Sequence, residues 1–215
     1  MTVMWTVVVP VKVLARAKSR LEGLAGPRRG ELALAMAADT VSAVLDCPEV
    51  ARVLAVTSDA VAGPQLASLG VSVASDEPAG GLNAALKHGA GVATLSWPGT
   101  GIAALSADLP ALRPAELSRA LRAASALQPR RTAFIADEQG VGTTLYVAPP
   151  GARFRPMFGG ASRRRHAASG ACELLLDGIP GLRRDVDTPA DLRAAVTLGV
   201  GARTMAVAGE LLSVG

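Results

Sequence analysis

Short, continuous apolar runs alternate along this chain with longer segments of helical periodicity, and no other sequence feature narrows the choice of fold as far. The early runs lack the apolar–polar alternation of half-exposed strands, which is typical of strands buried on both faces of a parallel sheet. This order of strands and helices predicts an α/β fold, a three-layer sandwich with a mostly parallel mixed sheet. We expect strands at residues 4–9, 53–57, 71–74, 102–106, 132–136 and 144–148, and helices at residues 29–45, 64–69, 82–93, 114–126 and 189–198.

The composition is that of one domain with its own apolar core. Half of the 215 residues are hydrophobic but only 3% are aromatic, so the core must consist of Val, Leu and Ala. Residues 149–160, rich in Pro and Gly, predict a loop, and we expect a single domain over residues 1–215. Two cysteines exclude a disulfide framework. No apolar stretch suits a bilayer and no export signal is recognisable, so we expect a cytoplasmic protein without a membrane partner.

The charge balance at first suggests a nucleic-acid partner, because the net charge is +4 and the sequence pI is about 9.7. The basic residues are mostly scattered arginines, however, with no aromatic side chains nearby to stack on bases, so we expect no nucleic-acid partner. Only three of the 22 basic residues are lysines, and Lys12 and Lys18 lie close together after the first strand. Lysine carries a compact point charge that suits phosphate, so this pair predicts small polyanionic substrates.

Polar side chains follow the predicted strands at the edge where the carboxyl ends of parallel strands meet, and open α/β sheets bind their ligands there. Lys12, Lys18 and Arg20 follow the first strand, and Asp108 follows the fourth. Cations from one loop and carboxylates from others suit a nucleotide bound with Mg²⁺, since carboxylates hold the metal and cations neutralise phosphates. The alternative for the basic loop is an ordinary solvated surface.

Four further acidic residues pose a choice between metal binding and helix capping. For Asp59 and Asp76, each of which follows a strand, capping is the favoured role. Asp185 and Asp187 lie two residues apart in a segment predicted to be extended, so their side chains project to the same side. Like charges this close need a cation or hydrogen bonds to offset their repulsion, which favours metal binding. The alternative is that Asp187 caps the helix predicted to begin at residue 189.

Several standard catalytic motifs are absent from the sequence. It contains no Walker-type phosphate loop, no dinucleotide-binding glycine motif after a strand, no zinc-protease helix motif and no serine nucleophile elbow. His88 lies in a predicted helix, and His166 follows the basic run 163–165, which could meet phosphate or face water. We therefore expect no strong general base. A reaction whose nucleophile is already an anion, such as a phosphate monoester, needs none.

A set of short motifs is spread in a fixed order over residues 7–201, which is nearly the whole chain. In chain order they are Val9-Pro10-Val11-Lys12, Lys18-Ser19-Arg20-Leu21, Asp39-Thr40, Thr57-Ser58-Asp59, Gly81-Leu82-Asn83-Ala84-Ala85-Leu86, Ala107-Asp108-Leu109-Pro110, Gly142-Thr143-Thr144-Leu145, Phe158-Gly159, Ser162, His166, Ser169-Gly170-Ala171, Asp185-Val186-Asp187-Thr188-Pro189 and Asp191-Leu192. The ordered set resembles the guanylyltransferases of deazaflavin coenzyme F-420 biosynthesis, which use phosphoenolpyruvate or 2-phospholactate. One departure is Val141, where the family usually has Thr.

The resemblance implies a fold, a cofactor and roles for the matching residues. The implied fold is Rossmann-like, of the nucleotide-diphospho-sugar transferase type, and the implied cofactor is Mg²⁺. The implied metal ligands are Asp108, Asp185 and Asp187. The implied contacts to the phospho-acid substrate are Lys12, Thr143, Gly159 and Ser162. The residues implied to bind the nucleotide are Lys18, Arg20, Gly81 and Asn83. The catalytic cations are Lys12, Lys18 and Arg20.

The implied activity is condensation of GTP with phosphoenolpyruvate, with pyrophosphate as the leaving group and transient handover of the product to the next enzyme. The alternatives are 2-phospholactate as the acceptor, another Mg²⁺-dependent nucleotidyltransferase of the molybdenum-cofactor or sugar-phosphate type, and a nucleotide-binding module without catalysis. The segment 10–12 argues against the second alternative, because those relatives carry a glycine-rich loop there. The intact set of three Asp residues argues against the third.

Overall fold

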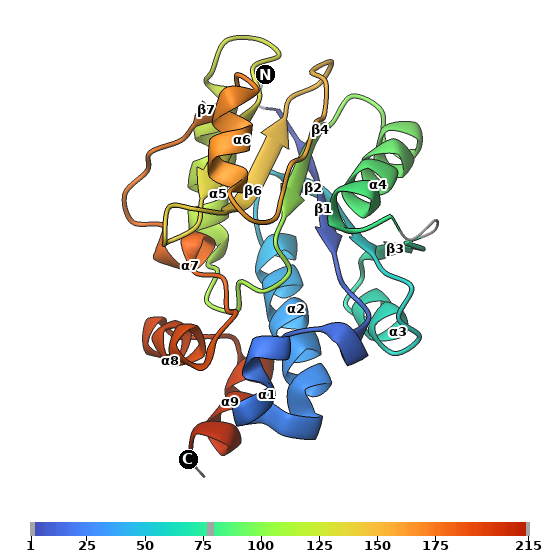
Figure 1. Ribbon diagram of the computed structural model, residues 1–215. Helices are drawn as coiled ribbons and strands as arrows, with labels where there is room; N and C mark the ends of the chain where they lie inside the picture. The colour runs from blue at the N-terminus through green and yellow to red at the C-terminus, as the bar shows by residue number, and fades with distance from the viewer. Residues whose placement is uncertain (1–2, 77–79, 214–215) are drawn as a thin grey trace.

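The computed structural model describes residues 3–76 and 80–213, and its centre is a mixed sheet (Figure 1). Seven strands make up this sheet in the described residues, in the order β3-β2-β1-β4-β6-β5-β7. All six predicted strands are present, and the two-residue β7 is the one that was not predicted. The bounds are β1 Trp5–Pro10, β2 Val50–Val56, β3 Ser72–Ala74, β4 Gly101–Leu105, β5 Ala133–Ala136, β6 Thr143–Ala148 and β7 Cys172–Glu173.

Strand directions bring several strand ends to one edge of the sheet. β1 pairs in parallel with β2 and β4, β2 with β3, and β5 with β7, whereas β6 runs antiparallel to both β4 and β5. The predicted mostly parallel mixed sheet is therefore confirmed. Because β6 alone is reversed, its amino end lies at the same edge as the carboxyl ends of β1, β4 and β5.

Helices cover both faces of the sheet and confirm the α/β class. The longer ones are α2 Arg29–Leu45, α4 Leu82–Ser96, α5 Pro114–Ser125, α8 Pro189–Leu198 and α9 Ala202–Ser213, and the shorter ones are α1 Glu22–Ala25, α3 Ala62–Ala67, α6 Ser162–Ala168 and α7 Pro180–Arg183. Residues of α2, α3, α5 and α7 share one apolar cluster with the sheet, and residues of α4 belong to the cluster on the opposite face. The predicted loop is confirmed, since residues 149–160 contain no helix or strand.

A third cluster places residues near the end of the chain beside residues near its beginning. Leu21 and Met36 pack there with Val186, Leu192 and Val207, so α9 lies against α1 and α2, and α8 packs against α9 (Figure 1). This packing brings the segment before α8 to the loop after β1. The sequence pattern predicts α8 but neither α6 nor α9. No helix among the described residues is both long and apolar enough to span a membrane.

Candidate active site

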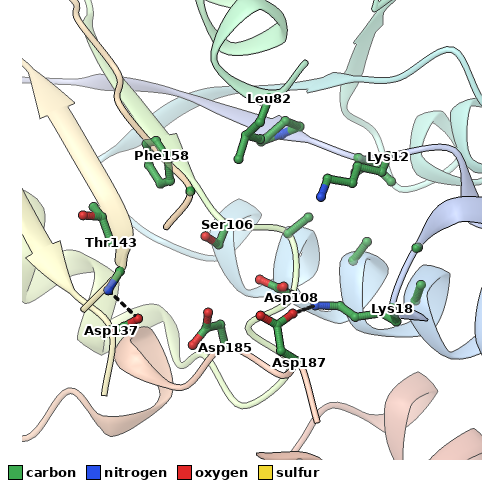
Figure 2. Close-up of a pocket in the computed structure, with 18 of the residues that line it drawn as sticks. Lys12, Lys18, Leu82, Ser106, Asp108, Asp137, Thr143, Phe158, Asp185 and Asp187 are labelled. Atoms are coloured by element: carbon green, nitrogen blue, oxygen red, sulfur yellow. Dashed lines mark hydrogen bonds and ion pairs between the residues drawn. The ribbon is translucent and has the colours of Figure 1, made fainter. Parts of the chain in front are cut away.

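A cavity of about 590 Å³ opens at the edge where β1, β4 and β5 end and β6 begins (Figure 2). It is lined by the basic loop after β1, the loop after β4, the β5–β6 turn, the loop before α6 and the segment before α8. The structure thus brings together most of the predicted site residues. Those that line the cavity are Lys12, Lys18, Arg20, Asp108, Thr143, Gly159, Ser162, Asp185 and Asp187.

Lys18 is the buried cation of this cavity. Its backbone lies in the left-handed region, with φ 54°, which is strained for a residue with a Cβ atom. Its Nζ donates to Asp187 Oδ1 at 2.9 Å and to Asp108 Oδ2, and only 11% of its side chain is exposed. Burial alone would lower the pKa of the Lys18 amine, but Asp108 and Asp187 outweigh it and hold the pKa above its ordinary value. Lys18 therefore stays charged and offsets two carboxylates.

The positive charge of Lys18 does not offset all of the negative charge around Asp185. Burial, and after it the carboxylates of Asp108, Asp187 and Asp137, raise the pKa of Asp185 to about 7. A carboxylate is pushed this far only where negative charge is crowded and poorly solvated. The cavity therefore favours the arrival of a further cation.

The chemistry of these donors suits Mg²⁺, which prefers carboxylate oxygens. Within residues 3–76 and 80–213, however, no three His, Cys, Asp or Glu side chains form a group that could hold a metal ion. Lys18 instead bridges Asp108 and Asp187 (Figure 2). An ion that binds these carboxylates must therefore take the place of the Lys18 amine, and the metal-ligand role of the three Asp residues stays a prediction.

The Asp187 carboxylate takes no part in the N-terminal cap of α8. Thr188 is the N-cap: its Oγ1 accepts from the Asp191 N–H at 3.2 Å, and Asp191 Oδ2 accepts from the Thr188 N–H at 2.9 Å. Asp187 contributes only its backbone N–H, which donates to Asp191 Oδ2 at 3.3 Å. The alternative that Asp187 caps this helix is therefore wrong, because Thr188 has taken that position.

Hydroxyl groups and a glycine loop form the opposite side of the cavity. Ser162 is 1% exposed, and its Oγ has no hydrogen-bond partner in the described part of the chain. Leaving a buried hydroxyl unpaired costs about 1–3 kcal/mol, so a polar ligand here would be stabilised. Gly159 has φ 92°, where residues with a Cβ are strained, although a Cβ would meet no atom within 4 Å. Thr143, the first residue of β6, is also buried in this wall.

Lys12 and Arg20 are exposed cations at the cavity, and Asp59 holds the loop that carries them. Asp59 Oδ2 accepts from the Leu14 N–H at 2.8 Å, and its Oδ1 accepts from the N–H of Ala62, the first residue of α3, at 2.9 Å. The capping role predicted for Asp59 is confirmed. The same carboxylate also ties the basic loop to the neighbouring strand end.

Gly81 and Asn83 are not among the described residues that line the cavity. Asn83 uses both polar atoms on the backbone of Phe158: its Oδ1 accepts from the N–H at 2.8 Å, and its Nδ2 donates to the carbonyl at 3.0 Å. Asn83 thus braces the loop that carries Gly159. The nucleotide-binding role of Gly81 and Asn83 stays a prediction.

Asp137 lines the cavity and is missing from the predicted set. Its Oδ1 accepts from the Val141 N–H at 2.8 Å and its Oδ2 from the Gly142 N–H at 2.7 Å, which shapes the turn leading to Thr143. A Cβ at Gly142 would lie 2.3 Å from Asp137 Oδ2, so this close approach requires glycine. The rule that selects Asp108, an acid in the loop that follows a buried strand, also selects Asp137, which comes directly after β5.

His166 neither faces water nor lines the cavity, unlike its neighbours Arg164 and Arg165, which are exposed. It is fully buried, its Nε2 accepts from the Met157 N–H at 2.9 Å, and its Nδ1 lies 3.0 Å from Thr143 Oγ1. Burial, and to a lesser extent Arg165, lower the pKa of His166 to about 4. The imidazole is therefore neutral at physiological pH. His88, by contrast, is exposed on α4.

Acid is expected to destabilise the fold through His166. An unfolded histidine titrates near pH 6.5, whereas folded His166 stays neutral down to about pH 4. As the pH falls through this window the unfolded state binds a proton that the folded state does not, so the free energy of unfolding falls by about 3 kcal/mol. Denaturant titrations at stepped pH measure this loss. It should disappear in His166→Gln and persist in His88→Gln, and equal slopes in the wild type and His166→Gln would contradict it.

Comparison with known proteins agrees with this geometry. A family model described as "Guanylyl transferase CofC like" matches residues 5–205. A protein of Streptomyces coelicolor named phosphoenolpyruvate guanylyltransferase is 59% identical over 213 residues, covering 98% of this chain and 99% of that one. A protein of Thermomonospora curvata with the same name is 57% identical over 207 residues, covering 96% of this chain and 90% of that one.

Solved structures show the same fold at low sequence identity. A protein of Desulfovibrio desulfuricans proposed to be a nucleotide-diphospho-sugar transferase has a TM-score of 0.70 at 16% identity, covering 96% of this chain and 94% of that one. A nucleotidyl transferase from Methanothermobacter thermautotroptrophicus has a TM-score of 0.62 at 20% identity, covering 91% and 97%. The predicted nucleotide-diphospho-sugar transferase-like architecture is therefore confirmed. With its cavity, its fold and a family match over nearly the whole sequence, the chain belongs to the CofC-like guanylyl transferase family.

Proposed function

We propose that this protein condenses GTP with phosphoenolpyruvate to give enolpyruvoyl-diphospho-guanosine and pyrophosphate, a step of coenzyme F-420 biosynthesis. The observation that carries the proposal is the cavity in which Lys12, Lys18 and Arg20 meet the carboxylates of Asp108, Asp185 and Asp187. The names of the relatives at 57% and 59% identity support phosphoenolpyruvate over 2-phospholactate as the acceptor.

The proposed reaction requires no general base from the protein. A phosphate oxygen of phosphoenolpyruvate attacks the α-phosphorus of GTP, and the bond from that phosphorus to the oxygen bridging to the β-phosphate breaks. The electron pair leaves with pyrophosphate. The nucleophile is an anion from the start, so a general base is not required. The neutral, enclosed state of His166 is consistent with this absence.

Repulsion between two polyanionic substrates is the main barrier that the protein must lower. Lys12 and Arg20 are placed to neutralise phosphate charge, and Lys18 can join them once the carboxylates have another cation. Asp108, Asp185 and Asp187 would hold Mg²⁺, which when bound supplies neutralisation of the phosphate oxygens around the reacting phosphorus. The position of Lys18 between two carboxylates supports this assignment, since these carboxylates already hold one positive charge.

The other wall offers donors for the phospho-acid. Ser162 has a buried hydroxyl without a partner among the described residues, and Thr143 supplies a second hydroxyl in the wall of the cavity. Gly159 leaves the backbone open to a close approach by an anion. These three residues suit the phosphate and carboxylate groups of phosphoenolpyruvate, whereas the carboxylates opposite suit a metal ion that would bind the nucleotide phosphates.

Pyrophosphate release from GTP is expected to depend on both Mg²⁺ and phosphoenolpyruvate. The purified protein is incubated with GTP and MgCl₂ and either phosphoenolpyruvate or 2-phospholactate, and a downstream acceptor is supplied to remove an unstable product. A chelator should abolish the signal. Release with 2-phospholactate alone would replace the acceptor in the proposal, and release only with a sugar phosphate or molybdopterin would replace the function. GTP binding by calorimetry without release with any acceptor would point to an inactive binding module.

A further inference from the structure

Four of the six aromatic residues of this chain lie around or next to one buried histidine. The sequence has three Phe and one Tyr. The His166 ring stacks on Tyr146 with centroids 4.7 Å apart at 18°, and the rings of Phe134 and Phe158 each lie 5.6 Å from it. The remaining one, Phe154, packs against Tyr146 at 5.7 Å. Three of the six aromatic residues of this chain therefore surround a single imidazole, behind the wall of the cavity that carries Thr143 and Gly159.

The hydrogen bonds of His166 determine its tautomer. The Met157 N–H can only donate, so Nε2, which lies 2.9 Å from it, must be the unprotonated nitrogen. A neutral imidazole then carries its hydrogen on Nδ1, and this hydrogen points at Thr143 Oγ1, 3.0 Å away. The buried aromatic enclosure excludes water from both nitrogens.

This tautomer settles the direction of the Thr143 hydroxyl. A hydroxyl group has one hydrogen to donate, and here its oxygen receives the hydrogen of His166 Nδ1. The hydrogen of Thr143 is therefore left for another acceptor, and no other hydrogen-bond partner of Oγ1 occurs among the described residues. Since Thr143 lines the cavity, the acceptor it suits is a ligand oxygen.

The second hydrogen bond acts on the glycine loop. His166 Nε2 holds the Met157 N–H, and the next residues of the loop, Phe158 and Gly159, reach the cavity. Arg165, one residue before His166 on α6, also donates to the Met157 carbonyl at 3.1 Å. One imidazole thus joins the two parts of the wall that the proposed function assigns to the phospho-acid.

We propose that His166 is a positioning residue for the phospho-acid substrate, which orients the Thr143 hydroxyl as a donor and anchors the loop that carries Gly159. The inference rests on the proposed function. His166 itself does not touch substrate, because it is fully buried and both ring nitrogens bind the protein. It acts through Thr143 and through the backbone at Met157.

Steady-state kinetics of His166→Phe, Thr143→Val and the double variant test this role. His166→Phe retains an aromatic ring but loses both hydrogen bonds, and we expect the KM for phosphoenolpyruvate to rise at least about 10-fold while the KM for GTP changes less than about 2-fold. Thr143→Val should act in the same direction. Because His166 works through Thr143, the effects should not multiply in the double variant. His166→Gln, which keeps one donor and one acceptor, should recover part of the loss.

Thr144→Val is the matched control. Thr144 follows Thr143 on β6 and is buried, its hydroxyl has no partner, and it is not among the residues that line the cavity in the described structure, so its KM values should stay at wild-type levels. Equal changes in both KM values, or multiplying effects in the double variant, would reduce His166 to a core residue and overturn the inference. The wild-type protein in the same assay separates the two hypotheses, since an inactive wild type contradicts the proposed function. In that case protection against thermal unfolding by phosphoenolpyruvate alone, which His166→Phe and Thr143→Val should both lose, decides the inference.

Discussion

Replacing Asp108 by Asn is expected to lower kcat for guanylyl transfer at least about 100-fold while the protein stays folded. Asp108 lies in the loop after β4, and its carboxylate pairs with the Lys18 amine. The substitution keeps the size of the side chain but removes the charge that would hold Mg²⁺, so the loss falls on the reaction. Asp187→Asn should have a similar effect, because Asp187 is the other partner of Lys18. Pyrophosphate release, with far-UV circular dichroism as a check on folding, measures both variants.

Asp46→Asn provides a matched control for this substitution. Asp46 is exposed at the carboxyl end of α2 and does not line the cavity in the described residues, so the same chemical change there should leave kcat within about 2-fold of wild type. Near-wild-type activity of Asp108→Asn would place the metal site elsewhere. Unfolding of the variant would be seen in its spectrum and would direct the test to Asp187→Asn.

Replacing Lys18 by Met is expected to lower kcat/KM for GTP at least about 100-fold and to make the stability of the protein depend on Mg²⁺. The amine is the buried counter-charge of Asp108 and Asp187, and without it these carboxylates repel each other. The melting temperature without divalent ions should therefore fall. Added Mg²⁺ should raise it more in the variant than in the wild type, where the Lys18 amine competes for the same carboxylates.

Lys87→Met is the control for the lysine substitution, since Lys87 is exposed on α4. It should retain wild-type kinetics and the wild-type response to Mg²⁺. Thermal unfolding over a Mg²⁺ titration, with Ca²⁺ as a second divalent ion, supplies a readout independent of turnover. An unchanged Mg²⁺ response in Lys18→Met would contradict competition between the amine and a metal at these carboxylates.

Most of the sheet and its main helices can be predicted from local patterns in the sequence. The segment 29–45 is predicted as a helix and forms α2 with those bounds, because its apolar residues recur at helical spacing over almost five turns. α9 and α6 are missed for different local reasons. Glycines at positions 199 and 201 interrupt the pattern before α9, and α6 is a seven-residue helix dominated by Arg side chains. β7 has only two residues, too few to show a period.

The acids of the site were predictable where a simple rule of topology applies. Asp108 lies three residues after the end of a buried strand whose carboxyl end must lie at the ligand edge. Asp137 fits the same rule, since it follows β5. Its carboxylate, however, accepts from two backbone N–H groups of the β5–β6 turn, and no local sequence pattern predicts these hydrogen bonds. The sequence allowed two roles for Asp187, metal binding and helix capping. The structure excludes the second, because Thr188 is the N-cap of α8.

The amino-acid sequence by itself determined most of the strands and the main helices, the edge of the sheet expected to bind ligands and most of the charged residues found there, because periodicity and strand ends are local properties. Tertiary structure alone decided which groups meet. Lys18 is 90 residues from Asp108 and 169 from Asp187. The first pair forms because β1 and β4 are neighbours in the sheet, and the second because α9 packs on α2 and α8 on α9, which brings Asp187 to the first loop. His166 follows three arginines in the sequence, yet burial against three aromatic rings keeps it neutral, and a hydrogen bond joins it to Thr143. The solvation of an ionisable group and its hydrogen-bond and charge partners determine its protonation state, and all of these are set by how the chain packs.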